Sequence, residues 1–315
     1  MPIIHEIKQE IDRYAAKNSP LDQVRRKYLK EVYKVNGGRP VVLYASCHAI
    51  KPSYGEGSAI NMADIQSFMV ALKGLKGDSL DIVLHSGGGV PDATEQIVNY
   101  VRGKFSDVRV IIPMSAMSAA TMLSCAADRI VMGHHSALGP IDPQVSVPFS
   151  GGIKSVPAQS IIDEFEEARK DLQSGGDPAF WANRLRFYPP GIVQDCRNYL
   201  VLSENSVTGW LKHYMLRSQP NSAAMAKSIA KWLADSTLHN WHRRPIGIVE
   251  ARSKGLLVDA LEDDDDLQEA VLSLFHATVI TFQQSLLVKI VENHNGKGSY
   301  TIEQIPRKGA GGGHS

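Results

Sequence analysis

Residues 111–133, IIPMSAMSAATMLSCAADRIVMG, join an apolar strand to a run of small side chains. After Pro113 nearly every residue is Ala, Ser, Thr or Met, and Ser115 and Ser118 lie three positions apart. A helix that begins directly behind a strand offers unpaired N–H groups at its first turn. The stretch therefore predicts a buried strand followed by a tightly packed helix whose N-terminus presents a serine.

A membrane span is the alternative for this stretch, because Val110–Ala127 is uncharged and close to spanning length. It contains Pro113, several hydroxyl residues and few bulky aliphatic side chains, which favours a buried strand plus helix. The first ten residues mix acids and bases, unlike a signal peptide. We expect no membrane span and a cytoplasmic location.

The composition is that of an ordinary globular protein. Of 315 residues, 43% are apolar and 21% charged, so the chain can bury a substantial core as one large domain or two modest ones. A net charge of +1 gives no electrostatic case for nucleic acid or an anionic membrane as partner. Cys47, Cys125 and Cys196 lack ligand spacing, which suits a reduced compartment. No cofactor is expected.

Predicted strands and helices alternate along the first 135 residues. Helices are expected at 3–34, 61–75, 91–105 and after Pro113, and strands at 40–45, 80–85, 108–113 and 129–132. Residues 158–235 look helical throughout, and the acidic run 262–266 precedes a helix expected at 267–290. This alternation predicts an α/β fold with a mostly parallel sheet.

The same pattern divides the chain into segments. We expect an N-terminal helical segment (1–38), an α/β core (39–157), a helical insert (158–235), a C-terminal part of the core with a final helix (236–305) and a flexible tail (306–315).

The turn Ser86-Gly87-Gly88-Gly89 lies between a predicted strand and helix, where glycines leave backbone N–H groups bare. Acyl-transfer chemistry needs such donors to hold an oxyanion, together with a nucleophile and a base. A phosphate cradle is a competing use, but GxxxxGK[ST] and GxGxxG are both absent. A turn that needs positive φ is the purely structural alternative. Pattern alone leaves Ser115, Ser118 and Ser124 open as nucleophiles, since GxSxG is absent.

The motifs together resemble the Clp/crotonase superfamily, and within it most closely the serine dehydrogenase proteinase family, related to signal peptide peptidase A and the Clp proteases. The resemblance is carried by SGGG, IVNYVR, MSAMSAATMLSCAADRIVMG and HSALGPIDPQ in this order, by PIGIVEARSKGLLVD near 245–259, and by KIVENHNGKG near 289–298. It implies a ββα spiral fold with a helical insert and C-terminal helices, a serine-peptidase activity and a homo-oligomer.

The resemblance makes Ser118 the nucleophile of an acyl-enzyme, with the backbone N–H groups of Gly88 and Ala119 as oxyanion donors. Two departures are small: SGGG replaces SPGG or TPGG, and Ser-Ala-Ala replaces Ser-Ala-Gly. Both leave the backbone roles possible.

The general base is the open question. Asp142, in GPIDPQ, occupies roughly the place of the Clp histidine, but the usual pKa of an aspartate is too low to activate a serine alone. Lys154 is the lysine candidate by analogy with signal peptide peptidases, because burial can lower a lysine pKa. An exposed loop position is the competing interpretation of Lys154.

The histidines are expected to be mainly structural. His134 and His135 begin the loop toward GPIDPQ, and His85 ends a predicted strand, so His85 and His135 are the foremost exceptions. His239 and His242 have helical spacing suited to a metal, but no third ligand is evident, and no metal is expected.

The function that follows is a serine-peptidase-like hydrolase acting on a peptide or protein. Two alternatives stay open: a crotonase-type enzyme acting on an acyl-thioester, with Asp142 as its carboxylate, and an inactive oligomeric scaffold of the same fold.

Overall fold

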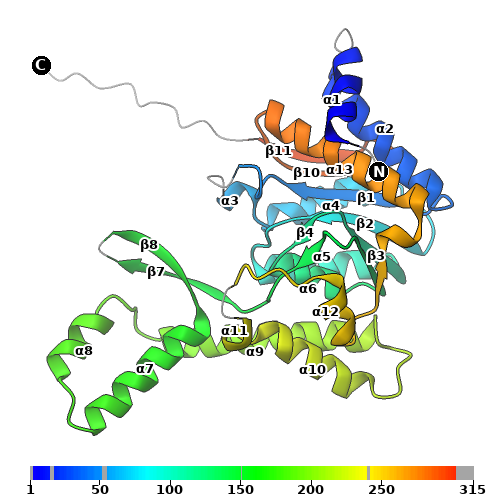
Figure 1. The fold of residues 1–315 in the computed structure, drawn as a ribbon. Coiled ribbons are helices and arrows are strands. Elements are labelled where there is room, and N and C mark those ends of the chain that lie inside the picture. Colours follow the sequence, from blue (N-terminus) through cyan, green and yellow to red (C-terminus); the bar gives the residue numbers. More distant parts are fainter. Residues whose placement is uncertain (1–2, 15–17, 52–54, 150, 240–241, 303–315) are drawn as a thin grey trace, which may run out of the picture.

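The computed structural model describes residues 3–14, 18–51, 55–149, 151–239 and 242–302. Its centre is a seven-stranded sheet in the order β11-β10-β1-β2-β3-β5-β9, in which β1, β2, β3, β5 and β9 are parallel (Figure 1). The antiparallel pairs β1–β10 and β10–β11 complete one edge. The protein is therefore α/β with a mostly parallel sheet, as the sequence predicts. The tail expected at 306–315 lies outside the described residues.

The strands of the large sheet are β1 (Val41–Ser46), β2 (Ser79–His85), β3 (Asp107–Ile112), β5 (Arg129–Met132), β9 (Val258–Ala260), β10 (Leu287–Asn293) and β11 (Gly298–Ile302). Two small sheets pair β4 (Ser115–Ala116) with β6 (Ala137–Leu138) and β7 (Gln144–Phe149) with β8 (Gly152–Pro157).

The helices are α1 (Ile4–Arg13), α2 (Pro20–Val35), α3 (Gly55–Ser58), α4 (Ala63–Leu72), α5 (Pro91–Arg102), α6 (Ala119–Cys125), α7 (Ala158–Gln173), α8 (Pro178–Leu185), α9 (Ile192–His213), α10 (Ser222–Ala234), α11 (Ser236–His239), α12 (Ile248–Ser253) and α13 (Asp265–Gln284), with a 3-10 turn at Leu261–Asp263.

The sheet is buried on both faces, because successive side chains of a strand point to opposite sides. In β1, Leu43 and Ala45 pack with α2 and α13, whereas Val42 and Tyr44 pack with α4, α5 and α6. This explains why the strand is a continuous apolar run without alternation.

Two sequence predictions need correction. The helix expected at 3–34 is two helices, because Ser19 has φ +53° and Pro20 begins α2, and a residue before proline is disfavoured in a helix. The helix expected at 267–290 ends at Gln284, and Leu287–Asn293 forms strand β10 beside β1. Its β-branched residues suit a strand.

The hairpin β7–β8 and the helices α7 and α8 project from the sheet as an arm (Figure 1). The hairpin packs with α7 and the first part of α9 in a small separate core that includes Ile161, Ile192 and Cys196. The second half of α9 and α10 instead pack on the main core, through Val207, Leu211 and Ile229 among others. The domain boundaries expected at 1–38, 39–157, 158–235 and 236–305 stay a proposal.

Candidate active site

The glycine turn and the serine-bearing turn meet at one edge of the sheet. Strands β2 and β3 are parallel neighbours, so the turns after His85 and after Ile112 emerge side by side. Ser86 pairs with Ala116, and Gly88 has φ +97°. A Cβ on Gly88 would lie 2.6 Å from the Met117 carbonyl oxygen and 2.8 Å from Ser118 Cβ. Glycine is therefore required at 88 by both conformation and space.

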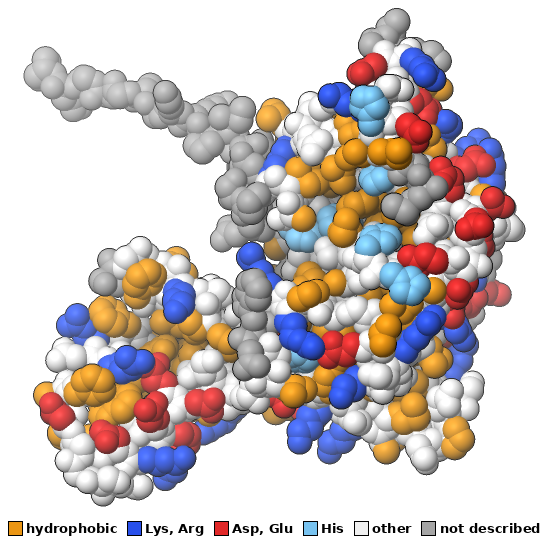
Figure 2. Space-filling model, in the orientation of Figure 1, with side chains coloured by type: hydrophobic (Ala, Val, Ile, Leu, Met, Phe, Trp, Pro, Cys, Tyr) orange, Lys and Arg blue, Asp and Glu red, His pale blue; other side chains and the backbone are white. Residues whose placement is uncertain are grey.

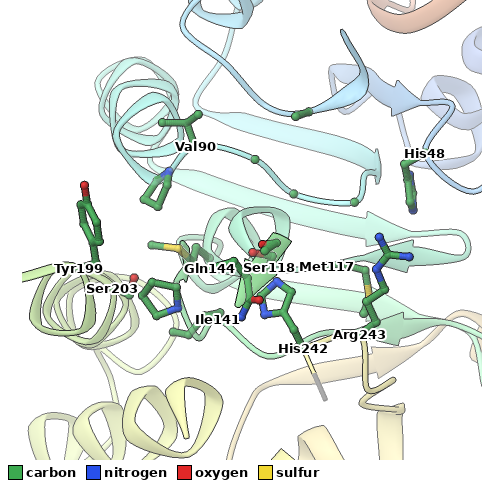
Figure 3. A pocket seen from close by; sticks show the side chains of 18 of the residues that line it. His48, Val90, Met117, Ser118, Ile141, Gln144, Tyr199, Ser203, His242 and Arg243 are labelled. Atoms are coloured by element: carbon green, nitrogen blue, oxygen red, sulfur yellow. The ribbon is translucent and has the colours of Figure 1, made fainter. Parts of the chain in front are cut away.

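Ser118 has a backbone conformation that a non-glycine residue rarely adopts. Its φ of +52° and ψ of −120° place it at the turn directly before α6. Such strain persists only where the surroundings enforce it, and it concentrates at functional sites. The side chain lines a cavity (Figure 3), whereas Ser124 is buried and donates to the Ala120 carbonyl. Ser115 also lines the cavity.

The cavity has a volume of about 970 Å³ and lies between the sheet edge and the arm (Figure 3). The core supplies the glycine turn with Val90, the turn at Met117 and Ser118, and Ile141. The arm side supplies Val145, Ser146 and Ser155 from the hairpin and Tyr199, Leu202 and Ser203 from α9. Most of the residues in the wall are small or apolar, as is usual for a ligand-binding pocket.

Next to Ser118 the cavity is lined by a histidine that is paired with a buried aspartate. His242 Nδ1 lies 2.7 Å from Asp142 Oδ1, and the Gln144 amide donates to Asp142 Oδ2 at 2.7 Å. Asp142 is only 2% exposed, and each of its carboxylate oxygens has one of these two partners. Figure 3 shows Ser118, Gln144 and His242 together in the central part of the cavity. An ionised Asp142 accepts the Nδ1 proton, which leaves His242 Nε2 as a proton acceptor.

Sequence reasoning missed His242 as a partner of Asp142, because the two residues are 100 positions apart. Its spacing from His239 suggested only a metal pair. His239 instead is buried, with Nε2 2.8 Å from the Trp232 carbonyl oxygen, and the described residues contain no cluster of three metal-binding side chains. The sequence feature that could have indicated a role for His242 is its position three residues before the PIGIVEARSKGLLVD motif.

Lys154 is not brought together with Ser118. It is an exposed residue of β8 and lines a separate groove with Phe149, Glu164 and Arg184. The adjacent Ser155 lines the central cavity, and neighbouring residues of a strand point to opposite faces.

The two expected oxyanion donors differ in their surroundings. The Ala119 N–H, at the first position of α6, has no hydrogen-bond acceptor among the described residues. The Gly88 N–H donates to Ser86 Oγ at 3.1 Å and would have to share or release that bond to hold an oxyanion. A Cβ on Gly88 would lie 3.0 Å from the Ala119 nitrogen, so the two donor residues are in close contact beside the cavity.

Two further histidines, His48 and His85, lie close to Ser115 in the serine-bearing turn. Ser115 Oγ lies 3.3 Å from His48 Nε2 and 3.4 Å from His85 Nδ1, and His48 Nδ1 contacts Ser46 Oγ at 3.2 Å. Burial lowers the pKa of His48 to about 4 and that of His85 to about 3, so both rings are neutral near pH 7. His85 is 1% exposed and does not line the cavity, and no sequence pattern singled out His48.

The remaining histidine candidates lie outside the cavity lining. His134 Nδ1 is 3.1 Å from Glu262, and His135 Nε2 is 2.9 Å from the Pro113 carbonyl oxygen.

An α/β sheet with a strained serine, a glycine turn and a His–Asp pair at one cavity defines a candidate serine hydrolase. Residues 58–177 match the family model of the ClpP-like SDH-type serine proteinases. The resemblance inferred from the motifs is thereby confirmed, and the match supports a serine-peptidase-like function.

Two curated relatives come from Methanocaldococcus jannaschii. The chain is 29% identical to the uncharacterized protein MJ0137 over 202 residues, which are 64% of this chain and 60% of that protein. It is 27% identical to the uncharacterized protein MJ1495 over 146 residues, 45% of this chain and 46% of that protein. The chain thus spans about three-fifths or less of the length of these relatives.

Among solved structures, a mutant of the 1510-N membrane-bound stomatin-specific protease is similar to this chain with a TM-score of 0.38 and 15% identity. The similarity covers 67% of this chain and 79% of that one. Within the described residues, no helix of this chain is long and apolar enough to cross a membrane.

Proposed function

We propose that this chain is a serine peptidase that cleaves peptide bonds through an acyl-enzyme on Ser118, with His242 as general base and Asp142 as the group that orients it. The observation that carries the proposal is that the strained Ser118 lines the same cavity as His242, which is paired with the buried Asp142. A nucleophile, a base and an orienting carboxylate are the parts that acyl transfer needs.

The proposed mechanism assigns one role to each of these residues. His242 Nε2 takes the Ser118 hydroxyl proton as Oγ bonds to the substrate carbonyl carbon, and the carbonyl oxygen becomes an oxyanion. The N–H groups of Ala119 and Gly88 stabilise that oxyanion. The C–N bond then breaks, and His242 returns the proton to the leaving amine. Water repeats the sequence on the acyl-enzyme and releases the second product.

His242 is a better candidate base than Lys154. His242 shares the cavity with Ser118, whereas Lys154 is exposed on the arm and lines another groove. A general base must reach the proton that it takes, directly or through one water.

The arrangement around Asp142 favours a peptidase over a crotonase-type enzyme. Enolate chemistry on an acyl-thioester needs a carboxylate that reaches the substrate, but Asp142 is buried with both oxygens held by His242 and Gln144.

The testing experiment is labelling by a fluorophosphonate, which reacts with activated serines, followed by peptide mass analysis. We expect an adduct on Ser118, none in Ser118→Ala, and labelling slowed at least a hundredfold in His242→Gln and Asp142→Asn. Lys154→Ala is the control and should label at the normal rate. Loss of labelling in Lys154→Ala but not in His242→Gln would transfer the base role to the lysine. A folded wild type that never labels would support the inactive scaffold.

We also propose a peptide or protein substrate and a homo-oligomer. The arm exposes large apolar side chains, among them Phe149 (49%), Ile153 (76%) and Phe180 (55%), and the orange side chains on the arm in Figure 2 illustrate this surface. Exposed apolar surface supports contact with another chain. Sedimentation velocity of the purified chain measures the oligomeric state. The cytoplasmic location stays a prediction.

A further inference from the structure

Formal charge is scarce in the wall of the active-site cavity. Among the described residues that line it, only Asp92 and Arg243 have an acidic or strongly basic side chain. Arg243 directly follows His242 and is exposed. Its neighbour Arg244 is occupied, because it donates to both carboxylate oxygens of Glu250 at 2.9 and 3.0 Å.

Arg243 makes no hydrogen bond or ion pair with another described residue. Asp142 is held by His242 and Gln144, and the ring nitrogens of His48 contact Ser46 and Ser115. The guanidinium is therefore a cation at the cavity without a counter-charge from the described wall.

The charge of Arg243 lies toward one end of the cavity. Figure 3 shows its side chain reaching between Met117 and His48, at the end opposite Val90. Asp92, the other charged residue of the wall, lies in the first turn of α5, two positions after Val90. The pKa of His48, which burial lowers, is lowered further by the charge of Arg243. This places the guanidinium within electrostatic reach of the His48 ring.

We propose that Arg243, beside Met117 in the cavity, forms a subsite that binds a carboxylate of the peptide substrate. The inference rests on the proposed peptidase function and gives it a substrate preference. A guanidinium holds a carboxylate through two parallel hydrogen bonds, and the flexible Met117 thioether suits packing against the aliphatic part of the bound residue. The carboxylate belongs either to an acidic side chain near the scissile bond or to the C-terminus of the peptide.

Binding to the Ser118→Ala protein tests the subsite without requiring cleavage. Fluorescence anisotropy is measured with a positional-scanning set of otherwise neutral peptides in which one position at a time is Glu, Gln or Lys. We expect the Glu peptides to bind about tenfold more tightly at one position, the usual order for a hydrogen-bonded charge. Adding Arg243→Gln should remove that preference, and Arg243→Glu should shift it toward Lys. Arg13→Gln, an exposed arginine on α1, is the matched control and should keep the preference.

Peptides with a free or an amidated C-terminus separate the two sources of the carboxylate. Tighter binding of the free than of the amidated peptide, removed by Arg243→Gln, assigns the subsite to the C-terminal carboxylate, whereas a Glu preference that survives amidation assigns it to a side chain. Absence of both a Glu preference and a preference for the free C-terminus, or the same preference in Arg243→Gln, overturns the subsite. Fluorophosphonate labelling of the wild type reports the peptidase chemistry separately, because the anisotropy is measured in a protein that lacks Ser118.

Discussion

At the scale of single residues, the geometry around Gly88 links the glycine turn to Ser118. Gly88 has φ +97° and faces the Met117 carbonyl and Ser118 Cβ at distances that exclude a side chain. Gly77 has a similar φ of +92° but open space around it. Comparing substitutions at Gly88 and Gly77 therefore separates the effect of a positive φ from the effect of steric contact with Ser118.

We expect Gly88→Ala to slow fluorophosphonate labelling of Ser118 at least tenfold and to destabilise the protein, because the methyl group displaces Ser118 or the turn. Gly77→Ala should lower the free energy of unfolding only by the strain of an alanine in the left-handed conformation, about 1 kcal/mol. It should leave the labelling rate unchanged. Labelling rates and urea unfolding of both variants check this. Equal labelling rates in the two variants would contradict the role of Gly88.

The paired residues Asp142 and His242 give a second prediction at this scale. Asp142→Asn keeps the size of the side chain but no longer favours the Nδ1–H form of His242 through a charge. We expect kcat to fall by about 10³–10⁴ with KM little changed, since the substrate-binding wall is untouched. Steady-state kinetics on a cleaved peptide measure both constants. A change confined to KM would argue against an orienting role.

At the scale of elements, strand β10 supports the active site from a distance. Lys289 is 2% exposed, and its ammonium group donates to Asp64 at 2.8 Å and to the Ala59 carbonyl at 2.7 Å. Tyr44 donates to the same carboxylate. The segment fixed in this way carries Ile60, which pairs with the glycine turn through Gly88 and Val90. The polar residues of KIVENHNGKG therefore include a buried lysine that anchors the segment paired with the glycine turn.

We expect Lys289→Met to cost about 3–5 kcal/mol of unfolding free energy, because it leaves the Asp64 carboxylate buried without its cation. Labelling of the protein that remains folded should also slow, since Ile60 loses its anchor. Lys34→Met, which breaks an exposed ion pair with Glu31, is the control and should cost less than about 1 kcal/mol. Adding Asp64→Asn to Lys289→Met should recover stability. No recovery would mean that the ammonium acts through packing alone.

At the scale of the whole molecule, the buried neutral histidines His48 and His85 couple folding to pH. Their pKa values in the folded protein are about 4 and about 3, below the usual value near 6.5. The unfolded chain therefore binds protons below pH 6.5 that the folded chain does not bind. The stability due to these rings is fully present above pH 6.5 and is lost as pH falls toward 4 and 3.

We expect the free energy of unfolding to fall between pH 6.5 and 4 by up to about 1.4 kcal/mol per pH unit for each histidine. Urea unfolding at pH 7.5, 6 and 5 measures the slope. His85→Gln should reduce the slope, whereas replacement of the exposed His213 by Gln should not. An unchanged slope in His85→Gln would show that other groups carry the dependence.

The sequence by itself determined the α/β class, the parallel core strands and the two turns that meet at the site. These are local features: apolar runs bounded by glycine and proline, and small residues after a strand. The same local patterns carried the resemblance that the family model confirms over 58–177. They failed at Leu287–Asn293, where an apolar run followed a helix directly and only pairing with β1 makes it a strand.

Tertiary structure alone decided which polar residues face the cavity. His242 and Asp142 meet across 100 residues, and Lys154 lies in a different groove although its sequence position suited a base. The brace from Lys289 to Ala59 joins residues 230 positions apart. Such contacts depend on how the arm, the sheet and the C-terminal strands pack together. No short-range periodicity encodes that packing, because it is set by burial and hydrogen bonding between segments distant in the chain.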